Sequence, residues 1–135
     1  QYKTFGSMQQ DKVNLENSNV GFNVPVITSL QQRKQLINQH FLTVIDYYTE
    51  WCGPCQTSAP KYAQLAQKYS KPGLCVLAKE NAENGVGGLP VDITGVPCFH
   101  FYVNGQFISS ETVTGADIEK LEETITRILN SIQPN

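Results

Sequence analysis

Two cysteines lie close enough in the sequence to form and break a disulfide bond. Cys52 and Cys55 are separated by Gly53 and Pro54, and a stretch with helical periodicity follows them. At the start of a helix, unpaired backbone N–H groups and the positive end of the helix dipole favour a thiolate, so we expect the pKa of the Cys52 thiol to lie below that of an ordinary cysteine. Cys55 lies about one helical turn further on, within disulfide reach of Cys52. The pattern therefore favours thiol–disulfide exchange.

Three other kinds of Cys-x-x-Cys site compete with this interpretation. A structural zinc site needs a second Cys/His pair at ligand spacing. The remaining cysteines and histidines stand alone in the sequence: His40, Cys75, Cys98 and His100. A purely structural disulfide across so short a loop would remove little chain entropy from the unfolded state. An iron–sulfur cluster shared between two subunits would lack further cysteine ligands nearby. We therefore favour the redox pair and expect no metal site.

An acidic residue interrupts the apolar run that precedes the two cysteines. Asp46 lies inside residues 42–48, which we predict to be a buried strand. It is either a hydrogen-bonded structural carboxylate, or a desolvated one with a raised pKa that moves protons during exchange. Because Asp46 lies near the end of the strand that leads to Cys52, we favour the second role. Lys79, in the next predicted strand, is the candidate partner of this carboxylate.

Alternating strand and helix patterns must position these residues. Apolar runs bounded by turn residues predict five strands: residues 24–27, 42–48, 74–79, 99–103 and 106–109. Pro25 confines the first strand to a sheet edge, because proline cannot donate to a ladder. Asn104-Gly105 is a strong hairpin signal between the last two strands.

Three helices are expected between and after these strands. The first begins after a cap at Thr28 or Ser29, the second covers residues 55–70, and the third starts near Ala116. The glycine-rich residues 81–94 predict no well-formed helix. The resulting order, β-α-β-α-β and then β-β-α, predicts an α/β fold with a central mixed β-sheet flanked by helices on both faces, parallel in its first half.

Length and composition describe an ordinary globular chain. Its 135 residues, 40% hydrophobic and 16% charged, suit one domain, which we place at residues 22–135 after a flexible N-terminal extension at 1–21. A partner-binding arm is the alternative role of that extension. The net charge of −2 offers no basic patch for nucleic acid, and the apolar runs are too short to span a membrane. The sequence shows neither a signal-peptide pattern nor an Asn-x-Ser/Thr acceptor, so we expect a cytoplasmic location.

Motifs in separate parts of the chain, all in one order, carry a family resemblance: residues 44–55, Ala59-Pro60, Gly95-Val96-Pro97 and Asn104-Gly105. Over residues 24–129 the chain resembles the thioredoxin family. The resemblance implies a thioredoxin fold, and it makes residues 22–135 a thioredoxin domain.

The resemblance also implies roles for the residues around the cysteine pair. Cys52 would be the attacking thiolate and Cys55 the buried thiol that resolves the mixed disulfide. Asp46 matches the buried carboxylate that assists deprotonation of the second thiol, and Lys79 matches the lysine beside it. Trp51 would pack against the active-site loop, which Gly53 and Pro54 complete.

A substrate-binding segment is implied further along the chain. Pro97 matches a cis-proline that faces the disulfide, and the backbone around Val96 would pair with an extended substrate segment. Gly115 matches a glycine near the substrate groove.

Several residues depart from the family pattern. Tyr47-Tyr48 replaces an aromatic pair that often includes Trp, and Gln56 stands where a basic residue is common, which weakens the attraction for acidic partners. Cys98 replaces the usual Thr after the cis-proline, so we expect it near the disulfide, either as a small buried side chain or as a regulatory thiol. We expect His100 to be a partly exposed sheet residue.

The activity implied by the resemblance is that of a general protein disulfide reductase. Its partners would be disulfide-containing proteins and a thioredoxin reductase, which would supply electrons from NADPH, and the chain itself would be a monomer without a bound cofactor. One alternative is an enzyme like protein disulfide isomerase in an oxidising compartment. Another is a thioredoxin-like module that binds partners without turnover.

Overall fold

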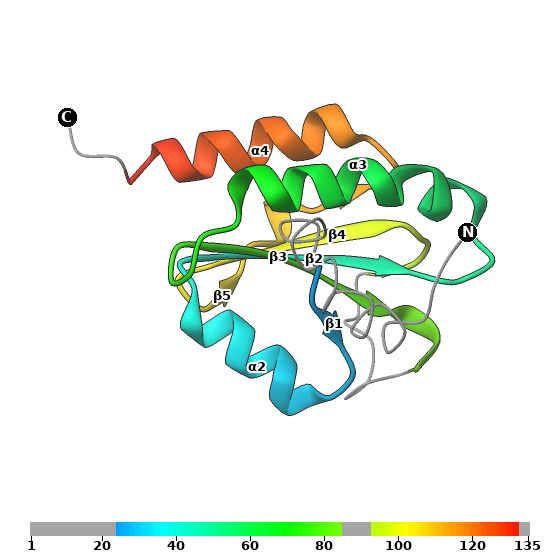
Figure 1. The fold of residues 1–135 in the computed structure, drawn as a ribbon, viewed down its shortest axis with the longest axis horizontal. Coiled ribbons are helices and arrows are strands. Elements are labelled where there is room, and N and C mark those ends of the chain that lie inside the picture. The colour runs from blue at the N-terminus through cyan, green and yellow to red at the C-terminus, as the bar shows by residue number, and fades with distance from the viewer. Residues whose placement is uncertain (1–23, 85–92, 133–135) are drawn as a thin grey trace, which may run out of the picture.

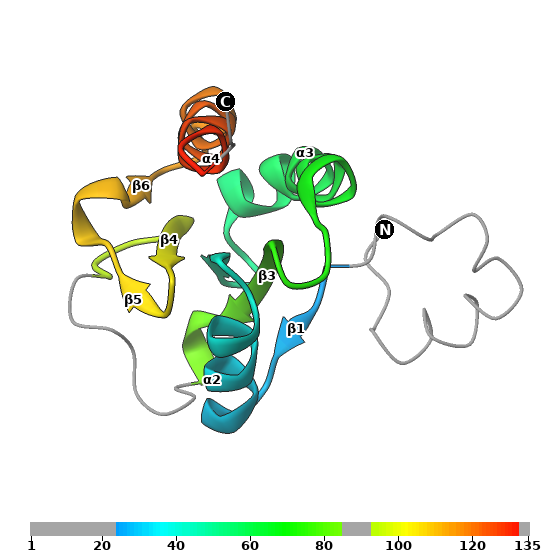
Figure 2. The same cartoon turned by 90° about the vertical axis from the view of Figure 1, so that its left-hand side faces the viewer.

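One sheet with helices on both faces forms the frame of the protein. The computed structural model describes residues 24–84 and 93–132. The sheet has six strands in the order β1-β3-β2-β4-β5, with β6 paired to β4. Helices α3 and α4 cover one face and α2 covers the other (Figures 1 and 2). This is the predicted central mixed sheet, whereas the extension at 1–21 and most of the 81–94 segment lie outside the described residues.

The first half of the sheet is parallel, as predicted. Strand β1 (Val26–Ile27) pairs with β3 (Cys75–Asn81), which pairs in turn with β2 (Leu42–Tyr48). Strand β1 lies at the edge of the sheet, where the missing N–H of Pro25 leaves no ladder hydrogen bond unmade. Strand β2 is central and buried almost throughout, which explains its nearly continuous apolar sequence.

The second half is antiparallel and begins with β4 (Cys98–Val103), which pairs with β2. Strand β5 (Gln106–Phe107) returns along β4 through a two-residue turn. Asn104 and Gly105 adopt φ values of 53° and 86°, the left-handed conformations that Asn-Gly hairpins require. Strand β6 (Val113–Thr114) follows the short helix η2 (Ser109–Glu111) and was not predicted, since two residues show no periodicity.

Each long helix begins at a side-chain cap. Ser29 caps α2 (Leu30–Gln39), Cys52 caps α3 (Gly53–Tyr69) and Asp117 caps α4 (Ile118–Asn130). A single turn, η1 (Ala82–Asn84), follows β3. Among the residues that the structure describes, no helix has the length and apolar character needed to cross a membrane.

Apolar side chains gather in two clusters, one on each face of the sheet. The larger lies under α3 and α4 and includes Tyr62 and Phe99, and the smaller lies under α2 and includes Tyr47 and Cys98. The expectation of a partly exposed His100 is wrong, because its exposed fraction is 0%. The ring of Phe107, brought back by the hairpin, lies 4.6 Å from the His100 ring and covers it.

Candidate active site

Cys52 and Cys55 form a disulfide at the N-terminus of α3. Their Cα atoms are 5.2 Å apart, and the backbone N–H of Cys55 donates to Sγ of Cys52 at 3.1 Å. Cys52 is 9% exposed and Cys55 is 4% exposed. The structure therefore shows the oxidised state, with the first sulfur held against the helix N-terminus and the second more deeply buried.

Local sequence explains why the helix begins at this point. Pro54 occupies the first turn, where its missing N–H removes no helical bond. The amide N–H of Gln56 donates to the Cys52 carbonyl at 3.1 Å, and the Gln56 side chain donates to the Glu50 carbonyl. These bonds join the loop after β2 to the first turn of α3, and Trp51, 74% exposed, projects from that loop.

Asp46 is a buried carboxylate near the end of β2. It is 4% exposed, and burial raises its pKa to about 7, while the charge of Lys79 acts in the opposite direction. Its Oδ1 atom makes no hydrogen bond to any described residue. A carboxyl group with a pKa near neutrality can both accept and release a proton under ordinary conditions.

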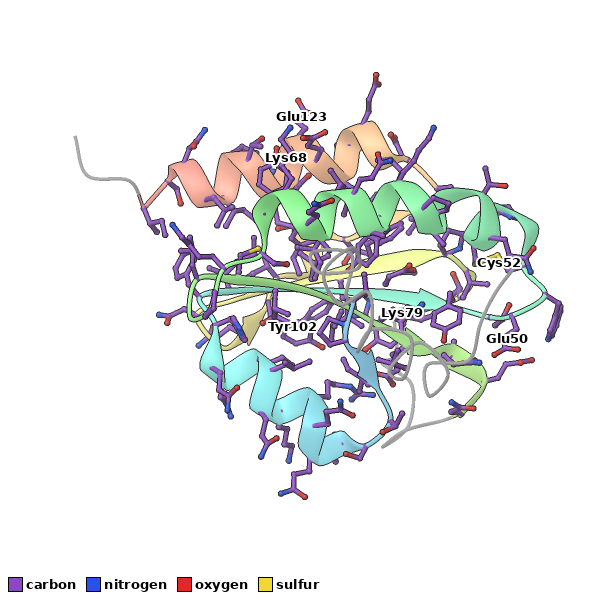
Figure 3. All side chains as sticks on the ribbon, viewed as in Figure 1. Glu50, Cys52, Lys68, Lys79, Tyr102 and Glu123 are labelled. Atoms are coloured by element: carbon purple, nitrogen blue, oxygen red, sulfur yellow. A yellow bond between two sulfur atoms is a disulfide. The ribbon has the colours of Figure 1, made fainter. Side chains whose placement is uncertain are left out.

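Lys79 lies beside Asp46 in the sheet. The two residues are register partners across β2 and β3, and the Lys79 ammonium lies 5.6 Å from the centre of the Tyr48 ring. Burial lowers the pKa of Lys79, and the charges of Asp46 and Glu50 partly restore it. Cys52, Glu50 and Lys79 all lie toward the same end of the sheet (Figure 3).

The segment before β4 lies against the disulfide. The Val96–Pro97 peptide bond is cis, as the family resemblance implies, and the Val96 carbonyl oxygen lies 3.7 Å from Sγ of Cys52. The Pro97 carbonyl accepts a hydrogen bond from the N–H of Gly115 at 2.9 Å. A groove of about 170 Å³ has these residues among its lining: Thr94, Gly95, Val96, Pro97, Cys98, Thr114 and Gly115. The structure thus brings Val96, Pro97 and Gly115 together around this groove, with Val96 next to Cys52.

Cys98 is buried rather than presented to solvent. It is 1% exposed and belongs to the α2-side cluster with Ile45 and Tyr47. A thiol in this position must be uncovered before it can be modified. Burial therefore favours the structural role, and a regulatory role stays a prediction.

Two features of the structure had no visible signal in the sequence. The guanidinium of Arg33 in α2 binds both carboxylate oxygens of Glu80 in β3, at 3.0 and 2.7 Å, and Glu80 is 0% exposed. The hydroxyl of Tyr62 in α3 bonds to backbone carbonyls of the sheet. The partner of a buried polar group depends on tertiary contacts, which no pattern in the sequence shows. Across the described residues, no three His, Cys, Asp or Glu side chains are grouped so that they could hold a metal ion.

Comparison with protein families gives a match over most of the chain. The family model described as Thioredoxin matches residues 23–127. The thioredoxin of Neurospora crassa is 34% identical over 99 residues, which cover 70% of this chain and 78% of that protein.

The structure of this chain is also similar to solved structures. A Plasmodium falciparum thioredoxin gives a TM-score of 0.64 at 28% identity, covering 82% of this chain and 100% of that one. A second similar chain comes from a study of the thiol-resolving mechanism in yeast mitochondrial 1-Cys peroxiredoxin via glutathione and thioredoxin systems. It gives a TM-score of 0.67 at 28% identity, and the match covers 78% of this chain and 95% of that one.

Proposed function

This chain belongs to the thioredoxin family and is a thiol–disulfide oxidoreductase that reduces protein disulfides, and from this premise we propose how its residues act and what supplies its electrons. The observation that carries the proposal is the disulfide at the N-terminus of α3, next to the strand that holds the buried Asp46.

The cycle begins with both active-site cysteines reduced. The Cys52 thiolate attacks one sulfur of a target disulfide, forming a mixed disulfide and releasing the other target sulfur as a thiolate. Cys55 then gives up its proton to Asp46, and its thiolate attacks Sγ of Cys52. The target leaves with both sulfurs reduced, and the Cys52–Cys55 disulfide seen in the structure is the product.

Lys79 and the loop residues have supporting roles in this proposal. The Lys79 ammonium stabilises the Asp46 carboxylate in an apolar environment, where an unpaired charge is costly. Gly53 and Pro54 set the first turn of α3, and exposed Trp51 contributes contact surface to the target.

The groove beside Cys52 receives the target. An extended segment carrying the target disulfide pairs with the backbone at Val96, and Pro97 and Gly115 shape the walls. The similarity to a chain studied with peroxiredoxin supports protein disulfides as the substrate class.

We further propose the context in which the enzyme works. A thioredoxin reductase returns the disulfide to the dithiol with electrons from NADPH, in the cytoplasm. The domain at 22–135 acts as a monomer and binds no cofactor of its own, and residues 1–21 form an extension outside it.

A coupled assay tests the proposed electron source. NADPH oxidation should require the chain, a purified thioredoxin reductase and a disulfide substrate such as insulin, and Cys52→Ser should abolish it. Cys55→Ser should instead accumulate a mixed disulfide with the substrate, visible by mass spectrometry. Turnover with glutathione and glutaredoxin but not with thioredoxin reductase would contradict the proposed donor.

A further inference from the structure

Tyr62 lies on the face of α3 that also carries Cys55. It is 1% exposed, and it follows Cys55 by about two helical turns. Both residues belong to the buried face of α3. Because they share one helix, the contacts of Tyr62 with the sheet also determine how Cys55 is oriented.

The hydroxyl of Tyr62 bonds to the two strands that carry Asp46 and Lys79. It donates to the carbonyl oxygen of Ala78 in β3 at 2.7 Å and lies 3.2 Å from that of Val44 in β2. Ala78 directly precedes Lys79, and Val44 lies on the same side of β2 as Asp46. One hydroxyl therefore links the disulfide-bearing helix to both strands of the carboxylate–lysine pair.

The link lies just beyond a weak point of the helix. Pro60 is inside α3 and has no N–H, so the helical hydrogen bond to the Gln56 carbonyl is missing. The first turn, which holds both cysteines, is less firmly joined to the rest of the helix as a result. Tyr62, two residues later, is well placed to hold the helix on the sheet at that point.

The ring of Tyr62 also helps to enclose Asp46. It packs against Phe99 with 5.5 Å between ring centres, and Phe99 is the register partner of Asp46 across β2 and β4. The described residues near Asp46 thus include Lys79 from β3, Tyr62 from α3 and the apolar Phe99 from β4. Asp46 raises the pKa of the Tyr62 hydroxyl, second to burial, so the two groups interact electrostatically.

We infer that Tyr62 is a positioning residue: its hydroxyl holds α3, and with it Cys55, in fixed register on β2 and β3, and by donating to the Ala78 carbonyl it favours the charged form of Asp46. The inference rests on the proposed role of Asp46 as proton acceptor. It assigns Tyr62 no contact with the substrate.

The test is the titration of Asp46 in Tyr62→Phe, which removes the hydroxyl and keeps the ring. In the oxidised protein the two active-site thiols do not titrate, so carbon-13 NMR reports the carboxyl group directly. Without the hydroxyl proton, the Ala78 carbonyl oxygen loses a hydrogen-bond donor one residue before Lys79, so more negative partial charge remains near the Asp46–Lys79 pair. We expect the pKa of Asp46 to rise by a few tenths of a pH unit, and the pH midpoint of the resolving step to move the same way.

Tyr69→Phe is the matched control. Tyr69 lies in the same helix, but its hydroxyl bonds to Glu122 of α4 at 2.6 Å. This variant should lose a tyrosine hydroxyl without moving either midpoint. An unchanged or lowered pKa of Asp46 in folded Tyr62→Phe would overturn the inference, as would an equal shift in Tyr69→Phe.

Two further measurements separate this inference from the proposed function. In the unsubstituted protein, the Tyr62 Cζ carbon signal should follow the titration of Asp46, which tests the coupling even if Tyr62→Phe does not fold. If Asp46→Asn leaves the pH profile of the resolving step unchanged, the proposed role of Asp46 fails, whatever the titration of Tyr62→Phe shows.

Discussion

At the scale of single residues, the carboxyl group of Asp46 has the largest consequence. Its side chain is 4% exposed, and its burial opposes ionisation more strongly than the charge of Lys79 supports it. Folding therefore becomes less favourable when this group must be charged. The proposed role in proton transfer explains why an apolar strand contains such a residue.

Asp46→Asn should stabilise the oxidised protein at alkaline pH. A folded-state pKa of about 7 against an ordinary value of 3.8 corresponds to on the order of 4 kcal/mol. Because the pKa of Asp46 is raised in the folded state, the free energy of unfolding of the wild-type protein falls by this amount as the pH increases from about 4 through about 7. The advantage of Asp46→Asn in urea unfolding should therefore be small below pH 4 and large at pH 8. A constant difference between the two proteins across this range would contradict a raised pKa.

Cys98 should be unreactive in the native oxidised protein. Its thiol is 1% exposed beneath α2, so alkylation requires local opening of the structure. We expect iodoacetamide to label Cys98 at least about 100-fold more slowly than in the urea-unfolded chain, as followed by mass spectrometry. Cys75, also 1% exposed, is the internal control. Rapid labelling of Cys98 alone would favour the regulatory role.

At the scale of elements, α2 is joined to the sheet by a buried ion pair. Arg33 binds Glu80 in bidentate geometry, and Glu80 follows Lys79 in β3. Glu80 points to the face of the sheet that α2 covers, whereas Asp46 lies on the face that α3 covers. The Arg33–Glu80 pair therefore stabilises the sheet on the face opposite the active site. Both charged groups lose hydration on burial, so removing one partner of this pair costs more stability than removing one partner of a surface pair.

Glu80→Ala should be strongly destabilising. It leaves the Arg33 guanidinium without its carboxylate partner, for which we expect a loss of about 3–5 kcal/mol in denaturant unfolding. Replacing both residues by Leu should cost much less, because no buried charge remains. Glu111→Ala is the matched control, since Glu111 binds exposed Arg127 at similar distances of 3.0 and 2.7 Å and should contribute little. Equal losses for Glu80→Ala and Glu111→Ala would contradict this account.

The elements themselves differ in how well sequence predicts them. Residues 42–48 are confirmed as a strand with the predicted bounds, because a central strand that helices cover on both faces is apolar on both sides. The Asn104-Gly105 hairpin is confirmed because its turn needs residues that tolerate positive φ. The burial of His100 was missed because its cover, Phe107, comes from the neighbouring strand. The Arg33–Glu80 pair was missed because its two residues lie far apart in the sequence and share no pattern.

At the scale of the whole molecule, the fold brings three distant segments to one end of the sheet. The loop after β2 and the first turn of α3 supply Cys52 and Cys55, β3 supplies Lys79, and the segment before β4 supplies Val96 and Pro97. The cysteines were predictable from their spacing, since thiol exchange needs both within one turn. The approach of Val96 to Cys52 was expected only from the family resemblance, because it depends on how β4 pairs with β2.

The central claim is that this chain acts as a reductant of protein disulfides, and its reduction potential tests that claim most directly. The Cys52/Cys55 pair should be equilibrated in defined dithiol buffers, with the fraction oxidised read by mass spectrometry. We predict a strongly reducing potential, close to the value of about −270 mV typical of thioredoxin. A potential near −180 mV or above, in the range of protein disulfide isomerase, would contradict the account.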